Sequence, residues 1–146
     1  MTIYFYKVNA PYGCFSNFSP HAIDLEDLTW KTVEHYYQAH KFVGSEDAWI
    51  IPTIRQAATP EAAAALGRDR NRKLRPDWET AKKEVMWRGV FTKFLTHKDI
   101  QETLLATGDQ LIVEDSPTDY YWGCGQNRTG KNELGKILMR VRQELR

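Results

Sequence analysis

The chain has 146 residues, a length that suits one domain able to bury about two thirds of its unfolded surface. Its 42% hydrophobic and 27% charged residues are typical of a soluble globular protein, and no stretch approaches the ~20 apolar residues of a membrane span. A net charge of +1 excludes a strong overall attraction to nucleic acid or membranes. Since no signal-peptide pattern opens the chain, we expect a cytoplasmic location.

Charged residues and cysteines are unevenly placed. Residues 1–50 carry three basic and six acidic side chains, whereas residues 55–93 carry ten basic and five acidic ones. A basic middle suits a phosphate-bearing substrate, although a solvated helix face gives the same pattern. Cys14 and Cys124 lie far apart, and neither they nor the four histidines show metal-ligand spacing. The sequence therefore predicts free thiols and no metal site.

Periodicity and capping signals predict mostly helices with a few short strands. In chain order the predicted elements are a strand at 3–8, a hairpin of 21–25 and 28–30, a helix from 32 to about 43, a helix beginning at 45 or 46 that is interrupted near Pro52, helices at 60–66, 77–97 and 99–106, a strand at 111–114, an irregular segment at 115–132, and a helix from 133 onward. Without repeats or linkers, this indicates a single compact α+β domain over 1–146, predominantly helical with a small β-sheet.

The helix from 32 to about 43 carries the most informative face. Thr32 is a good N-cap, which places Glu34, Tyr37, Gln38 and Lys41 on one side. An acid, an amide, a cation and an aromatic ring directed at one spot suit a sugar or nucleobase site. A solvated Glu–Lys face on an ordinary helix is the alternative interpretation.

Two loops add polar groups of their own. Phe15 and Phe18 flank Ser16 and Asn17, and either the rings pin this loop to the core or they flank a ligand that Ser16 and Asn17 hydrogen-bond. The loop at 68–75 holds five cations, a density that stability does not require. It predicts a phosphate or nucleic-acid contact.

The irregular segment at 115–132 is long for a compact domain, and such loops are usually functional. It contains Asp119, Trp122, Gly123 and Asn132. Glycines let the backbone approach a ligand, and a helix starting at Asn132 would offer free N–H groups to an anion. Neither a P-loop nor a dinucleotide-binding fingerprint is present.

Taken together, these motifs resemble the NADAR family of YbiA-like proteins. The similar segments run in order along nearly the whole chain: Phe15-Ser-Asn-Phe, Trp30-x-x-Val-Glu-His-Tyr-Tyr-Gln-Ala-x-Lys, Leu66-Gly-Arg-Asp-Arg, Leu104-Leu-Ala-Thr-Gly, Asp119-x-x-Trp-Gly-x-Gly and Gly130-x-Asn-x-Leu-Gly. The resemblance implies a small, helical α+β domain that hydrolyses an N-glycosidic bond between ribose and an exocyclic amino nitrogen. It implies one of two substrates, ribosylaminopyrimidine phosphates from riboflavin biosynthesis or ADP-ribosylated guanine in DNA or RNA.

The chemistry assigns roles within these motifs. Glu34 and Asp119 form the predicted carboxylate pair, one acting as acid and the other as base or electrostatic partner. Lys41 offers a different route, a Schiff base with the ribose carbon. We predict that the hydrolysis needs no metal or other cofactor. The predicted substrate-binding residues are Ser16, Asn17, Phe18, Tyr37, Gln38, Arg68, Arg70, Trp122, Gly123 and Asn132.

Alternatives stay open for both the residues and the function. Trp122 would equally serve as a core anchor, and Arg68 and Arg70 as surface salt-bridge partners. The same pocket would also suit a non-catalytic module that binds ADP-ribose or a nucleotide. A third possibility, a partner protein of a toxin–antitoxin pair, makes no use of the polar residues, and we predict no obligate protein partner.

Overall fold

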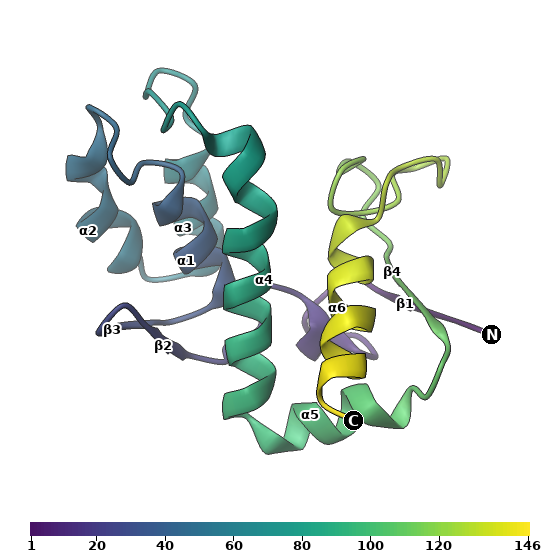
Figure 1. Cartoon of the computed structure of the whole chain (residues 1–146). Coiled ribbons are helices and arrows are strands. Elements are labelled where there is room, and N and C mark those ends of the chain that lie inside the picture. The colour runs from purple at the N-terminus through teal and green to yellow at the C-terminus, as the bar shows by residue number, and fades with distance from the viewer. The chain divides into compact units, whose positions relative to one another are not determined.

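The computed structural model describes residues 1–146, which form two units interleaved in the sequence (Figure 1). Unit 1 consists of Met1–Ser19 and Phe94–Arg146, and unit 2 of Pro20–Lys93. Each unit has its own helices and its own pair of strands.

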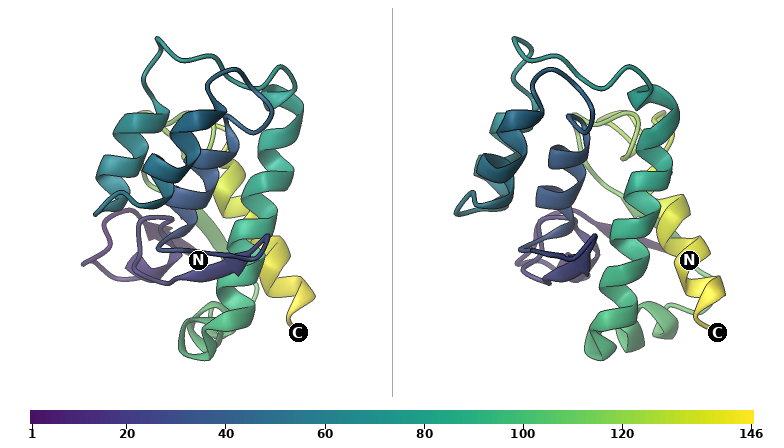
Figure 2. Two further views of the ribbon diagram at one scale, coloured as in Figure 1. Left: turned by 90° about the vertical axis from the view of Figure 1, so that its left-hand side faces the viewer. Right: turned by 60° about the vertical axis from the view of Figure 1, so that its left-hand side comes forward.

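Unit 2 is built around a short buried helix, α1 (Val33–His40). Helices α2 (Ile51–Arg55) and α3 (Pro60–Gly67) pack against α1 (Figure 2). The remaining elements are the antiparallel strands β2 (Ile23–Leu25) and β3 (Leu28–Trp30), a 3-10 turn η2 (Ala48–Ile50), and α4 (Trp78–Thr96), which belongs to this unit as far as Lys93.

Local signals explain where these helices begin. Thr32 has extended backbone and its hydroxyl accepts a hydrogen bond from the N–H of His35 at 3.2 Å, so the predicted N-cap is confirmed. Thr59 caps α3 in the same way, with Pro60 in the first turn. The helix predicted to begin at 45 or 46 begins only at Ala48, as the 3-10 turn η2, and it changes to α2 at Ile51, beside the interruption predicted near Pro52. Pro52 lies in the first turn of α2, where its missing N–H has no partner to lose.

A carboxylate in the β2–β3 turn ties this hairpin to the helices of unit 2. Glu26 has a positive φ of 56°, as two-residue hairpin turns require. Its carboxylate accepts a hydrogen bond from the Tyr36 hydroxyl at 2.7 Å and lies 2.8 Å from Nε2 of His40. Arg88 of α4 lies 3.6 Å from the same carboxylate. The cluster thus joins the hairpin, α1 and α4.

Unit 1 joins the two ends of the sequence. Strand β1 (Thr2–Phe5) pairs in parallel with β4 (Leu111–Glu114), so that Thr2 lies opposite Leu111. Helix α6 (Glu133–Glu144) packs against β4 and α5 (Lys98–Ala106), and a 3-10 turn η1 covers Gly13–Phe15. The strand predicted at 3–8 ends early, because the exposed residues after Phe5 turn back toward η1.

The predicted fold class is confirmed as a predominantly helical α+β fold. Its predicted small sheet consists of two separate strand pairs, one in each unit. None of the helices combines the length and apolar composition that crossing a membrane requires.

Two buried histidines of α1 predict a loss of stability in acid. His35 is held between the Thr32 hydroxyl and the carbonyl of Ala57, and burial lowers its pKa below 6.5. Burial also lowers the pKa of His40, against the opposing effect of Glu26. Below pH 6.5 the unfolded histidines bind protons that the folded ones refuse, so protons favour unfolding.

We therefore expect these two histidines to leave the free energy of unfolding unaffected above about pH 7 and to lower it below pH 6.5, by at most about 1.4 kcal/mol per pH unit for each histidine. Urea unfolding across pH 5–8 measures this slope. A His35→Gln variant, whose amide still reaches a carbonyl acceptor, should show a shallower slope. An equally steep slope in the variant would contradict the assignment.

Candidate active site

The central feature of unit 2 is that α1 is buried on every side, although half of its side chains are polar. Glu34 is 5% exposed and Gln38 2% exposed. This rules out the solvated Glu–Lys face as an explanation of the pattern. Buried polar groups require partners, so the arrangement of these side chains is informative.

Glu34 and Gln38 form a directed pair. Nε2 of Gln38 donates to Oε2 of Glu34 at 2.7 Å. Because a carboxylate only accepts, this bond turns Oε1 of Gln38 away from Glu34, and that oxygen is buried with no hydrogen-bond partner. A Cβ at position 67 would collide with the Gln38 amide, so only Gly67 permits this approach of α3. The pair thus presents a buried acceptor that lacks a donor.

Lys41 follows directly after α1 and is electrostatically coupled to Glu34. Its Nζ lies 3.4 Å from the carbonyl of Gly67 and 5.6 Å from the centre of the Tyr37 ring. Burial lowers the pKa of Lys41 from 10.5 to about 8, Glu34 opposes this shift, and Arg68 and Lys82 add to it. A substantial fraction of this lysine is therefore a neutral amine at mildly alkaline pH, as nucleophilic catalysis requires.

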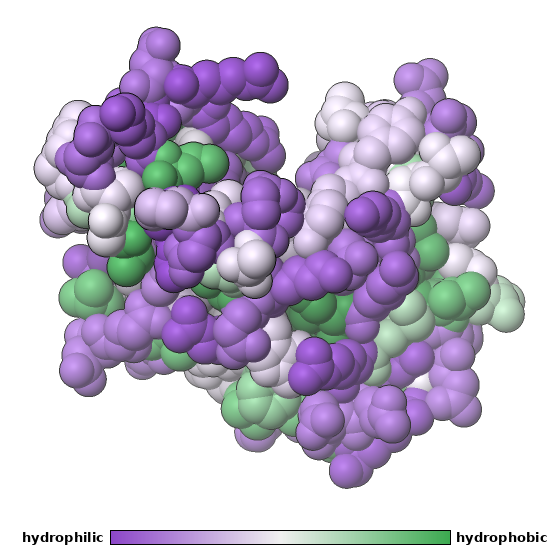
Figure 3. Space-filling view, turned by 45° about the horizontal axis from the view of Figure 1, so that its top comes forward, coloured by the Kyte–Doolittle hydropathy of each residue, from purple (hydrophilic) through white to green (hydrophobic).

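Beside Lys41 lies a basic pocket of about 440 Å³. It is lined by Lys41, Gly67, Arg68, Asp69, Arg70, Arg72 and Leu74. Hydrophilic residues cover most of the face shown in Figure 3, around scattered hydrophobic patches.

Only two of the five cations at 68–75 lack a protein partner. Arg72 pairs with Asp69 at 3.1 Å, Lys73 with Glu46 at 3.3 Å, and Arg75 with Asp77 at 2.7 Å. The two that remain, Arg68 and Arg70, both line the basic pocket. The salt-bridge alternative therefore does not apply to them, and their charges are available to an anion.

The other predicted site residues belong to unit 1. In the first loop, Ser16 and Asn17 are buried, and the Ser16 hydroxyl accepts a hydrogen bond from the N–H of Phe18 at 3.1 Å. Phe15 packs edge-on against Phe5 and Phe94. This ring pins the loop to the core of its unit, while Phe18 is half-buried.

Asp119 organises the loop at 115–132. Its Oδ1 accepts hydrogen bonds from the N–H groups of Tyr121 at 2.9 Å and Trp122 at 2.7 Å. Trp122 is 8% exposed and meets the Tyr121 ring at right angles, with centroids 4.8 Å apart. Asp119 therefore fixes the backbone that positions Trp122 and Gly123, in addition to any chemical role.

Two substitutions separate these roles of Asp119. Asn retains an oxygen acceptor for both N–H groups but removes the charge, whereas Ala removes both. If Asp119 only holds the loop, Asp119→Asn should keep its melting temperature and activity, and Asp119→Ala should lose about 1–3 kcal/mol of stability. If Asp119 acts in the chemistry, Asp119→Asn should keep its stability and lose turnover. Thermal unfolding and kcat, measured for both variants, distinguish the loop-holding role of Asp119 from a chemical role.

The expectation of free N–H groups at the start of α6 was wrong. The N–H groups of Asn132, Glu133 and Leu134 donate to the carbonyls of Gly123, Tyr121 and Trp122, so the loop itself satisfies them. The Asn132 side chain does not cap the helix either. It pairs with the backbone of β4, accepting from the N–H of Glu114 and donating to the carbonyl of Ile112, both at 2.9 Å.

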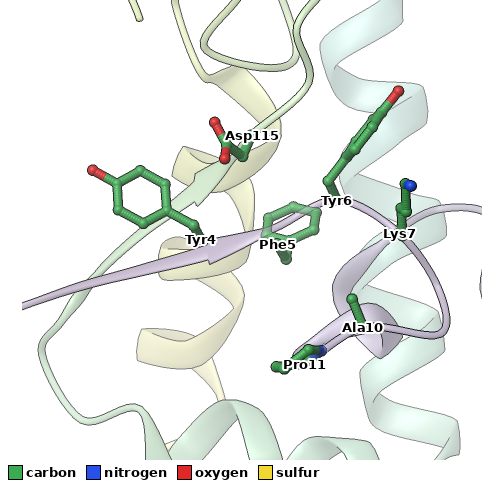
Figure 4. A pocket seen from close by; sticks show the side chains of 7 residues that line it. All are labelled: Tyr4, Phe5, Tyr6, Lys7, Ala10, Pro11 and Asp115. Carbon is green, nitrogen blue, oxygen red and sulfur yellow. The ribbon is translucent and has the colours of Figure 1, made fainter.

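Unit 1 also contains a pocket of about 320 Å³ that holds none of the predicted residues (Figure 4). Tyr4 and Asp115 line one side, with Arg128 lying 4.3 Å from the centre of the Tyr4 ring and 3.6 Å from Asp115. Tyr6 and Lys7 line the other side.

No group of three or more His, Cys, Asp or Glu side chains is arranged to hold a metal ion in this chain.

Sequence reasoning missed two contributors to unit 2. In the sequence Gly67 is visible only as part of the Leu66-Gly-Arg-Asp-Arg motif, and its contact with Gln38 depends on the packing of α3 against α1. The Glu26 cluster was likewise missed, although an acidic pair at a hairpin turn was visible. Nothing in the sequence places its partners, Tyr36 and His40, against that turn.

Comparisons with known proteins identify close relatives. A family model described as the NADAR domain matches residues 4–146. An N-glycosidase of Nostoc punctiforme is 66% identical over 146 residues, which cover 100% of this chain and 94% of that protein. The chloroplastic riboflavin biosynthesis protein PYRR of Zea mays is 44% identical over 98% of this chain, which spans only 25% of the maize protein. The NMR structure of Escherichia coli YbiA matches with a TM-score of 0.90 at 41% identity, covering 99% of this chain and 84% of that one.

Proposed function

The chain belongs to the NADAR family and is an N-glycosidase, and from this premise we propose that its substrate is a ribosylaminopyrimidine phosphate of the riboflavin pathway. The reaction would transfer water to the anomeric carbon of ribose and release the exocyclic amine. The maize relative, whose name assigns it to riboflavin biosynthesis, supports this choice of substrate.

The observation that carries the proposal is the set of groups gathered around Lys41. Arg68 and Arg70 are unpaired cations in the pocket that Lys41 also lines, which suits a substrate phosphate. Glu34 is close enough to influence the Lys41 ammonium. A ribose anchored by its phosphate would thus meet a carboxylate and an amine of lowered pKa.

Two routes are compatible with these groups. In the first, Glu34 activates water or stabilises positive charge at the anomeric carbon, that carbon bonds to the water oxygen as its bond to nitrogen breaks, and the departing nitrogen gains a proton from solvent. The pairing of Asp119 with Glu34 stays a prediction. In the second, neutral Lys41 attacks the imine form of the ring-opened sugar. The amine leaves with a proton, and water then hydrolyses the lysine imine to free the sugar and Lys41.

Gln38 would act as a positioning residue in either route, because its Oε1 is buried against Gly67. Its Nε2 meanwhile holds the Glu34 carboxylate in place. Tyr37, beneath the Lys41 ammonium, would cover the sugar or base. The roles predicted for Trp122 and the loop at 15–18 remain predictions.

A turnover assay tests the substrate directly. The protein and a Glu34→Gln variant are incubated side by side with 5-amino-6-(5-phosphoribosylamino)uracil and with DNA bearing ADP-ribosylated guanine. Release of ribose 5-phosphate from the first, lost in the variant, is the expected result. Release of ADP-ribose alone would replace the proposed substrate with the nucleic-acid modification. Binding without cleavage of either would leave the non-catalytic binding module.

A further inference from the structure

Trp49 is the most exposed large aromatic side chain of the protein, with 64% of its surface accessible. It lies in η2 of unit 2 and contributes to none of the predicted functions. Burying a tryptophan is strongly favourable, so an exposed indole on a protein surface commonly marks a binding site for a ligand or partner.

Two contacts hold this indole in position. Its Nε1 donates to Oδ1 of Asp47 at 3.1 Å, and the guanidinium carbon of Arg72 lies 5.9 Å from its ring. Oδ2 of Asp47 accepts a hydrogen bond from the N–H of Lys73 at 2.6 Å. Asp47 therefore fastens Trp49 to the basic loop, and the exposed ring is oriented rather than freely rotating.

Arg72 connects this ring with the basic pocket. It is one of the pocket-lining residues and is itself fixed, since its Nη1 donates to the Leu66 carbonyl at 2.9 Å and to Asp69 at 3.1 Å. Leu74, which is 44% exposed, lines the same pocket and adds apolar surface. An oriented aromatic face thus adjoins a pocket that contains two unpaired arginines.

We propose that Trp49 is a stacking platform for a flat heteroaromatic ring that a ligand carries beyond the phosphate held by Arg68 and Arg70. The inference rests on the proposed phosphate site and extends it. Arginines that bind a phosphate, next to an indole on which an aromatic ring can stack, suit a nucleotide-like group. A ligand that ends at its phosphate would not reach Trp49. Trp49 would therefore determine specificity between these two classes of ligand.

Isothermal titration with two probes tests this assignment. Ribose 5-phosphate ends at its phosphate, whereas ADP continues from its phosphates to a purine ring. Trp49→Ala should weaken ADP binding on the order of 10-fold and leave ribose 5-phosphate binding unchanged, because stacking on one aromatic ring contributes about that much. Trp49→Phe keeps a smaller aromatic face and should lose less. Leu28→Ala, another exposed apolar side chain of unit 2, is the matched control.

An Arg70→Ala variant separates this inference from the proposed function. Weaker binding of both probes by Arg70→Ala, with only ADP affected by Trp49→Ala, supports both assignments. If Arg70→Ala weakens both probes but Trp49→Ala and Trp49→Phe change neither, the stacking platform is refuted and the phosphate site stands. If Arg70→Ala changes neither probe, the phosphate site fails, and the platform fails with it.

Discussion

Glu34→Gln is expected to lower kcat by about 10²- to 10⁴-fold while the protein stays folded and still binds substrate. Gln keeps an oxygen that can accept the hydrogen bond from Gln38, so the buried pair survives. What it loses is the negative charge that activates water or stabilises charge at the anomeric carbon. Steady-state kinetics, together with thermal unfolding and substrate titration, measures all three quantities.

Glu26→Gln provides the matched control for this loss of charge. Glu26 is a carboxylate of the same unit, bonded to Tyr36 and His40 and absent from the lining of the basic pocket. Its replacement should reduce stability and leave kcat nearly unchanged. A Glu34→Gln enzyme with wild-type kcat would remove Glu34 from the chemistry altogether.

Lys41→Arg is expected to reduce turnover on the order of 10³-fold if Lys41 acts as a nucleophile. Arginine keeps a cation in the pocket but supplies no neutral amine at accessible pH. Because the pKa of Lys41 is about 8, the neutral fraction of wild-type Lys41 grows as the pH rises toward 8 and levels off above it. The rate should follow that curve upward, whereas a role as ammonium predicts a rate that falls through the same range.

Reduction with borohydride during turnover tests the covalent route independently. An imine between Lys41 and ribose would be trapped as a stable adduct on the peptide that contains Lys41, visible by mass spectrometry. The control variant Lys31→Arg alters a lysine that donates to the carbonyls of Gln56 and Ala57, and it should still form the adduct. The Lys41→Arg variant should form no adduct. If Lys41→Arg retains activity without an adduct, the route through Glu34 alone is favoured.

The sequence predicted what local chemistry determines. Thr32 needs only its neighbours to cap α1, and the spacing of Glu34 and Gln38 on one helix face follows from the helical repeat. The excess of cations at 68–75 was equally visible in the sequence. The sequence could not show which of these cations lack an acidic partner, because the ion pairs depend on where Asp69, Asp77 and Glu46 lie in the folded chain.

Features that depend on packing between distant segments could not be predicted. The burial of all of α1 requires α2 and α3 to cover it, and nothing near Glu34 in the sequence indicates this. The same holds at Asn132. A good N-cap residue predicted available N–H groups, but the residue has a positive φ of 54° and the preceding loop supplies carbonyls to the first turn. Local propensity identified the helix start and could not identify its partners.

The interleaving of the two units has a consequence for folding during synthesis. Strand β1 is synthesised before unit 2, yet its parallel partner β4 is made only after every residue of unit 2. Unit 2 is one continuous segment with many local contacts, so it can fold while β1 waits. Until β4 emerges, both edges of β1 are open to pairing with other chains. An unpaired β1 therefore remains a site for pairing with other chains even after unit 2 has folded, until β4 appears.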